Sequence, residues 1–254
     1  MRSPSRNFYA GFIALVLALP GAGHALEPTC HTSSDYDITV TETGLQFERK
    51  NPAGQRLEMR RGELAIDSRA VALGADDRQR VAAFESRVRE LVPKVKTIAQ
   101  RGVDLMVMAI REEAVSAAPE SASQPDINAR VDARARQLKL KIARSTTSKE
   151  WHADALQGDL AALLSDVAPL LTGDLARQAL DRTLKGDLAG VIALKDRAVA
   201  LRGSLERRVR AKLDLLQPDI GRLCPALREL DRLENGVTQR LPDGSRLNLI
   251  KLDS

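Results

Sequence analysis

Aromatic side chains are scarce in this chain of 254 residues, where they make up 3% of the composition. Only Tyr36, Phe47, Phe84 and Trp151 lie beyond the first 25 residues. Proteins that bind single-stranded nucleic acid stack the bases on aromatic rings, and small-molecule pockets also use such rings. Four scattered rings form no evident platform, so we expect no nucleic-acid partner.

The motifs of common enzymes are also absent. Beyond the first 25 residues the histidines are His31 and His152, and a serine-histidine-aspartate triad would have to use one of them. The chain contains no HExxH motif, no Gly-x-Ser-x-Gly elbow, no CxxC pair and no phosphate-binding glycine loop. We therefore predict no catalytic, cofactor-binding or metal-binding residue, and we favour a protein that is not an enzyme.

Carboxylate pairs are the exception that the sequence leaves open. Glu112-Glu113 and Asp76-Asp77 are adjacent acids, but neighbouring side chains on a helix point in different directions. Pairs of the glycosidase type are brought together by tertiary structure, so the sequence does not exclude them. Among the remaining candidates, His152 beside Trp151 is the first residue to inspect, although a plain position at a helix end is the favoured explanation.

The N-terminus has the three parts of a secretory signal peptide. Arg2 and Arg6 supply positive charge, an apolar run follows from Phe8 to Leu19, and small residues precede a cleavage site. We predict cleavage between Ala25 and Leu26 and a periplasmic address in a bacterium. The alternatives are an uncleaved N-terminal anchor and a lipid attached to Cys30. The apolar run is shorter than the roughly 20 residues that span a bilayer, and no later stretch reaches that length, so we expect no integral membrane segment in the mature form.

The positive charge of the chain is small and does not indicate a polyanionic partner. Removal of Arg2 and Arg6 with the leader lowers the formal net charge from +5 to +3. The pI of about 9.4 therefore reflects a slight surplus on a chain that is dense in charges of both signs.

Two cysteines, Cys30 and Cys224, predict one disulfide bond. An even cysteine count in an exported chain is typical of such a bond, and two unpaired thiols are the alternative. In the chain-entropy model, closing so long a loop stabilises the fold by up to roughly 5 kcal/mol.

The region 26–74 alternates apolar and polar residues with a period of two, which is typical of β-strands. Turn signals at Thr43-Gly44 and at Asn51–Gly54 separate the alternating runs. The sequence therefore predicts three or four short antiparallel strands within the runs Tyr36–Val40, Leu45–Arg49, Leu57–Arg60 and Leu64–Asp67.

A helical body is predicted over 75–235. Asp76 and Asp77 supply a cap and a first-turn acid. Apolar residues then recur three and four positions apart, a heptad-like seam typical of bundle cores and coiled coils, in which Pro93 should cause a kink. The seam consists of Val81, Phe84, Val88, Leu91, Val95 and Ile98. Further segments are a loop over Pro119–Pro125, a helix over Asp126–Lys149, a helix from Leu188 towards Pro218, and another from Asp219.

Two smaller features of the helical body admit a structural explanation. The pattern Gly-Asp-Leu-Ala recurs at 158–161, 173–176 and 186–189, where glycine can end one helix and aspartate can cap the next. One acid in each repeat is too few for a calcium site. The basic cluster of Arg207, Arg208, Arg210 and Lys212 is typical of a solvated helix face.

The last segment, 236–254, predicts a β-hairpin around the turn Pro242–Ser245. Since both ends of the chain are β-rich and both carry a cysteine, we expect the terminal strands to join one sheet. The predicted fold class is α+β and mostly α: an elongated helical bundle with a small antiparallel sheet formed by N- and C-terminal strands.

The chain resembles the YggN-type family of exported bacterial proteins of unknown function. The resemblance rests on the signal, Cys30 and five short motifs: Tyr36–Val40, Gly62–Asp67, Leu91-Val92-Pro93, Cys224-Pro225 and Leu233-Glu234. It implies a Gram-negative periplasmic address and no catalytic residue.

Two functional hypotheses follow from the sequence. The favoured one is a non-enzymatic envelope protein that scaffolds or binds another envelope protein, because amphipathic helices and mixed charge are abundant. The alternative is a periplasmic hydrolase or a small-ligand binding protein whose site is formed only in the fold. A pocket with converging polar groups would favour the alternative, and an exposed apolar surface would favour the scaffold.

Overall fold

The computed structural model describes residues 30–50, 54–117, 124–151 and 179–253. The described residues divide into two compact units. The sheet unit comprises those of Met1–Val95, Ser145–Leu156 and Asp219–Ser254, and the helical unit those of Lys96–Arg144 and Gln157–Pro218. The predicted leader with its Ala25-Leu26 cleavage site, His152 and the first two Gly-Asp-Leu-Ala repeats lie outside the described residues.

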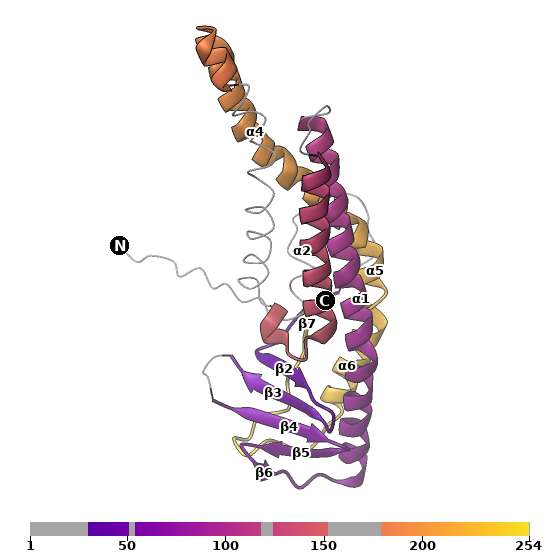
Figure 1. Cartoon of the computed structure of the whole chain (residues 1–254). Coiled ribbons are helices and arrows are strands. Elements are labelled where there is room, and N and C mark those ends of the chain that lie inside the picture. Colours follow the sequence, from indigo (N-terminus) through magenta and orange to yellow (C-terminus); the bar gives the residue numbers. More distant parts are fainter. Residues whose placement is uncertain (1–29, 51–53, 118–123, 152–178, 254) are drawn as a thin grey trace, which may run out of the picture. The chain divides into compact units, whose positions relative to one another are not determined.

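The sheet unit is built on a five-stranded antiparallel sheet in which each strand pairs with the next in sequence (Figure 1). Pairing Leu45 with Met59 and Phe47 with Leu57 puts these apolar side chains on one face, as the alternation predicted. The tight turn between the paired residues Arg60 and Glu63 has Arg61 and Gly62 at positive φ, as a two-residue hairpin requires. The strands are β2 (Tyr36–Val40), β3 (Leu45–Arg49), β4 (Arg56–Arg60), β5 (Glu63–Ile66) and β6 (Arg69–Ala70).

A distant segment covers the outer edge of β2. The Val40 N–H donates to the Thr146 carbonyl at 2.8 Å, and the Ile38 N–H donates to Ser148 Oγ at 3.0 Å. The same hydroxyl donates to the buried Asp37 carboxylate at 2.9 Å. These bonds pair the edge groups of β2, which would otherwise be open to association with another strand. They belong to the segment that ends in the short 3₁₀ helix η2 (Ser148–Trp151).

Helix α1 (Ala75–Ala117) begins at the predicted acids. The Asp77 carboxylate accepts hydrogen bonds from the Thr238 N–H, the Thr238 hydroxyl and the Gln239 N–H, so it also anchors the segment that follows the last helix. These bonds, led by the one from the Thr238 N–H, hold the pKa of Asp77 below its ordinary value. Pro93 lies inside the helix, which continues through it.

The predicted apolar seam of α1 packs onto the sheet. Val81, Phe84, Val88 and Leu91 are buried together with the apolar side chains of β3, β4 and β5. The ring centroids of Phe84 and Phe47 lie 6.3 Å apart, a usual separation for packed aromatic rings. Helix α6 (Cys224–Asn235) contributes Leu227 and Leu230 to the same core.

In the helical unit, α1 packs with α2 (Gln124–Arg144) and α4 (Leu188–Leu213). Asp187 accepts the Gly190 N–H and caps α4, as the third Gly-Asp-Leu-Ala repeat predicted. Arg208 and Lys212 of the basic cluster pair with Glu113 and Glu112 of α1, at 2.9 and 2.6 Å. Part of that cluster is therefore an ionic contact between helices rather than a purely solvated face. The short elements η3 (Asp214–Leu216) and α5 (Gln217–Gly221) follow α4.

The predicted fold class, with one small sheet formed by both termini of an elongated bundle, is wrong. The main sheet has five strands and is formed by residues 36–70 alone. The termini form a separate two-stranded sheet, in which β1 (His31–Ser33) pairs with β7 (Lys251–Asp253).

The predicted C-terminal hairpin is likewise not formed as a ladder. The Leu241 N–H bonds to the Ser245 carbonyl at the expected turn, but no strand flanks that turn until β7. The physical reason is that Leu247 and Leu249 are buried in the core, and that the Glu234 carboxylate accepts the backbone N–H groups of Leu249 and Ile250. A hydrogen-bonding partner from α6 thus replaces the opposing strand.

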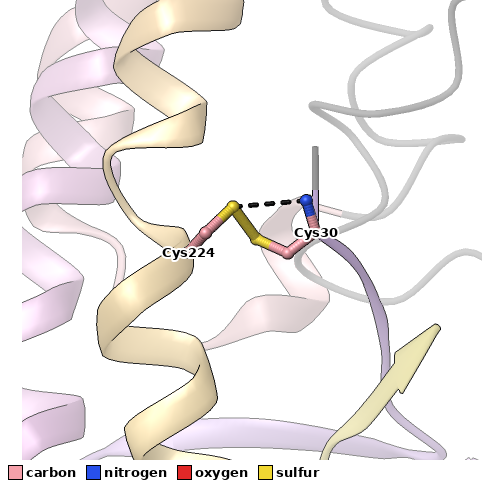
Figure 2. Close-up of a disulfide and its surroundings, with 2 residues drawn as sticks. All are labelled: Cys30 and Cys224. Carbon is pink, nitrogen blue, oxygen red and sulfur yellow. Dashed lines mark hydrogen bonds between the residues drawn. A yellow bond between two sulfur atoms is a disulfide. The ribbon is translucent and has the colours of Figure 1, made fainter. Parts of the chain in front are cut away.

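The predicted disulfide between Cys30 and Cys224 is confirmed. The two Cα atoms lie 5.6 Å apart, and the Cys30 N–H also donates to Cys224 Sγ at 3.2 Å (Figure 2). The bond joins the beginning of the described chain to the first residue of α6. None of the helices in the described ranges combines the length and the apolar character needed to cross a bilayer.

Candidate binding site

The sheet unit contains an apolar pocket with a cavity volume of about 90 Å³. Its walls come from β2 and β3, from α1, from the α5–α6 region and from the backbone stretch before β7. The pocket is partly open to solvent. Its lining is Cys30, Ser34, Tyr36, Ile38, Phe47, Phe84, Val88, Leu91, Val92, Val95, Ile220, Leu223, Leu227, Leu230, Leu249 and Ile250.

Helical periodicity explains the two longest walls. Helix α1 presents a stripe of five lining residues from Phe84 to Val95, spaced three and four positions apart with one adjacent pair. At 1.5 Å of rise per residue, that stripe extends over roughly 16 Å. The start of α6 shows the same spacing of four and three positions, at Leu223, Leu227 and Leu230.

The hydroxyl groups in the lining already have hydrogen-bonding partners. Ser34 Oγ accepts the Tyr36 N–H at 3.1 Å and donates to the Tyr36 carbonyl at 3.2 Å. The Tyr36 hydroxyl donates to Gln55 Oε1 at 3.1 Å, and burial raises the pKa of that phenol. Cys30 is oxidised in the disulfide and offers no thiolate. The pocket therefore presents hydrocarbon to a ligand.

One ionisable group supports the pocket wall from behind. Glu234 is 3% exposed, lies one helical turn after Leu230, and accepts the N–H groups of Leu249 and Ile250, which are both lining residues. Burial raises the pKa of Glu234 to about 7. The two backbone hydrogen bonds favour the ionised form and oppose this rise, but burial has the larger effect. Asp231 on the same helix raises the pKa further.

Of the residues that the sequence analysis singled out as candidates, Cys30 lines the pocket. Trp151 is buried, and its Nε1 donates to Ser145 Oγ at 3.0 Å. His31 lies in β1. The adjacent acids serve in structural contacts: Asp77 anchors the chain after α6, and Glu112 and Glu113 pair with α4. Among the described residues, no group of histidines, cysteines and acids is placed to hold a metal ion.

Sequence reasoning missed the pocket, although it identified part of its wall. The heptad-like seam contains Phe84, Val88, Leu91 and Val95, and we interpreted it as ordinary core. No pattern within one helix distinguishes a core position from a lining position, because the difference depends on whether the opposite wall makes contact.

Glu234→Gln should change the pH dependence of stability. The folded pKa of about 7 exceeds the ordinary value of 4.5, so the stability contributed by Glu234 is complete below pH 4.5 and is lost as the pH rises through 7. Between pH 5 and pH 8 the free energy of unfolding of the unmodified protein should therefore fall by about 2 to 3 kcal/mol more than that of the variant. Urea unfolding of both proteins at the two pH values measures the difference.

A matched control is Glu229→Gln, at a half-buried position of the same helix where the carboxylate is paired with Arg87. That variant should retain the pH dependence of the unmodified protein. Parallel pH dependences for the unmodified protein and Glu234→Gln would show that Glu234 does not titrate in this range.

In a comparison with known protein families, residues 30–250 match the family described as protein of unknown function (DUF2884). No curated protein and no solved structure matches the chain. The matched range contains both cysteines and every residue that lines the pocket. Because the match spans most of the sequence, the chain belongs to the DUF2884 family of proteins of unknown function.

Proposed function

We propose that this chain is an exported, non-enzymatic protein that binds the apolar part of a small ligand in the pocket of the sheet unit. The observation that carries the proposal is a partly open pocket whose lining is hydrocarbon and whose hydroxyl groups are already hydrogen-bonded. Binding there would be driven by removing apolar surface from water, at about 0.8 kcal/mol for each buried CH₂ group. The proposal takes up the small-ligand alternative that the sequence left open, with a hydrocarbon lining in place of the converging polar groups expected for it.

Binding fits this pocket better than catalysis. A hydrolase needs a nucleophile or an activated water, a general base and a group that stabilises developing charge. The lining has no carboxylate, imidazole or amine, and its one sulfur is part of the disulfide. The nearest buried acid, Glu234, uses its oxygens on backbone N–H groups behind the wall.

Titration with hexane tests the pocket directly. In protein labelled at methyl groups, the NMR signals of Val88, Leu91 and Leu227 should shift saturably, because these side chains line the pocket. The signals of Ile127 and Val131, which are buried in the helical unit, should not shift. Val88→Phe should lower the affinity at least tenfold by filling the pocket, while thermal unfolding checks that the fold is kept.

The matched control is Val115→Phe, the same change at a valine of α1 that is 55% exposed and lies outside the pocket. It should bind hexane like the unmodified protein. Equal shifts in both units, or binding unaffected by Val88→Phe, would contradict the proposed site.

The proposed address is the periplasm. It rests on the charged, apolar and small-residue layout of the first 25 residues, and a disulfide suits an oxidising compartment. Mass spectrometry of the protein purified from a Gram-negative host should give a mature chain that begins at Leu26. A chain that still begins at Met1, or a lipid on Cys30, would disprove this export route.

Partner binding is a second candidate, favoured by exposed apolar side chains in the helical unit. Leu188 and Ile192 of α4 are 69% and 61% exposed and lie one turn apart, and surfaces of this kind often contact other proteins. A photoreactive residue at position 188 should then crosslink one defined envelope protein in cells. The same residue at Arg60, an exposed position of the sheet unit, should not crosslink it. Identical capture at both positions would exclude a specific surface on α4.

A further inference from the structure

We propose that the pocket takes a single unbranched hydrocarbon chain, namely that of a fatty acid or a comparable single-chain amphiphile. The inference rests on the proposed function and adds the chemical class of the ligand. It follows from the combination of a long lining and a small volume, from the lack of free polar groups, and from the absence of charge in the lining.

The first argument is the shape of the pocket. The stripe from Phe84 to Val95 extends over roughly 16 Å of α1, yet the cavity volume is only about 90 Å³. Pockets for drug-sized molecules hold about 300 to 1,000 Å³, and an engineered cavity that accepts benzene holds about 150 Å³. A space that is long but small in volume is narrow. It accepts the end of a flexible chain, whose remaining methylenes lie along the open side of the pocket, and it excludes a fused ring system.

The second argument excludes a peptide as the occupant. Every residue of a bound peptide brings an N–H and a carbonyl group, and leaving these unpaired in an apolar site is costly. The hydroxyl groups of Ser34 and Tyr36 are engaged within the protein. The edge of β2 is not free to pair with a peptide, because the N–H groups of Val40 and Ile38 bond to the segment that ends in η2. A methylene chain has no donor or acceptor group that must be hydrogen-bonded inside the pocket.

The third argument concerns the polar end of the ligand. Burying an ionised group without a partner costs several kcal/mol, and the lining contains no charged side chain. A carboxylate or other head group must therefore stay in water, at the open part of the pocket. The ligand is consequently amphiphilic, with its chain inside and its head outside, and the pocket selects the chain rather than the head.

Calorimetric titration with butanoate, hexanoate, octanoate, decanoate and dodecanoate, each kept below its micelle concentration, tests the inference. Affinity should increase about three- to fourfold for each added methylene until the pocket is full, and then level off. Dodecyltrimethylammonium, which has an alkyl chain one methylene longer and the opposite charge, should bind within about tenfold of dodecanoate. Adamantanecarboxylate, which has a comparable apolar surface in a rigid cage, should bind far more weakly.

Variants at Val88, in the middle of the α1 stripe, locate the chain in the pocket. Val88→Phe should make the affinity level off at a shorter chain, because the ring interrupts the path. Val88→Ile adds only one methylene and should give a smaller shift in the same direction, which keeps the test valid if the larger change disturbs folding. Val115→Phe should leave the chain-length profile unchanged.

The outcomes separate the two proposals. If hexane binds at the pocket but adamantanecarboxylate binds as well as decanoate, or affinity does not increase with chain length, the pocket is a binding site for another apolar class and this inference is wrong. If neither hexane nor the alkanoates shift the methyl groups of Val88, Leu91 and Leu227, the proposed function itself is wrong.

Discussion

The packing of the apolar stripe of α1 against one face of the five-stranded sheet is the contact on which the sheet unit depends. A twisted antiparallel sheet with one apolar face must bury that face, and here the stripe from Val81 to Leu91 and the start of α6 cover it. The side chains of Leu57 and Met59 are almost completely buried at the centre of this contact. Near β2 the covering helices leave a cavity, so the pocket results from incomplete contact between the same layers.

Segments far apart in the sequence are held around that core by a few strong polar contacts. Asp77 fixes the chain after α6, Ser148 fixes the edge of β2, and Glu234 fixes the stretch before β7. The disulfide adds a covalent link between residues separated by 194 positions, which in the chain-entropy model stabilises the fold by up to about 5 kcal/mol. Three of these contacts, those of the disulfide, Ser148 and Glu234, involve lining residues, so the walls of the pocket are fixed in place even where they are not regular strands.

A preformed wall is what an apolar binding site requires. Hydrophobic attraction has no direction, so selectivity among apolar ligands must come from the shape of the space. The disulfide fixes Cys30 and, through Cys224, the neighbouring Leu223. The Glu234 carboxylate holds the backbone N–H groups of Leu249 and Ile250. Charge contributes little to this selection, because no charged side chain lines the pocket.

Local patterns determined much of this protein. Alternation gave the strands around Phe47 and Met59, helical spacing gave the stripe on α1, and the even cysteine count gave the disulfide, because each feature depends on neighbours in sequence or on a single possible pairing. Only the tertiary structure decided that the N-terminal strands form their own five-stranded sheet, and that Glu234 takes the place of a partner strand for Leu249 and Ile250. It also decided that Val88 and Leu91, which are buried in the core of the sheet unit, line a pocket there. Those outcomes depend on which distant surfaces meet and how closely they fit, and a periodic pattern carries information about the face of an element but not about the partner that covers it.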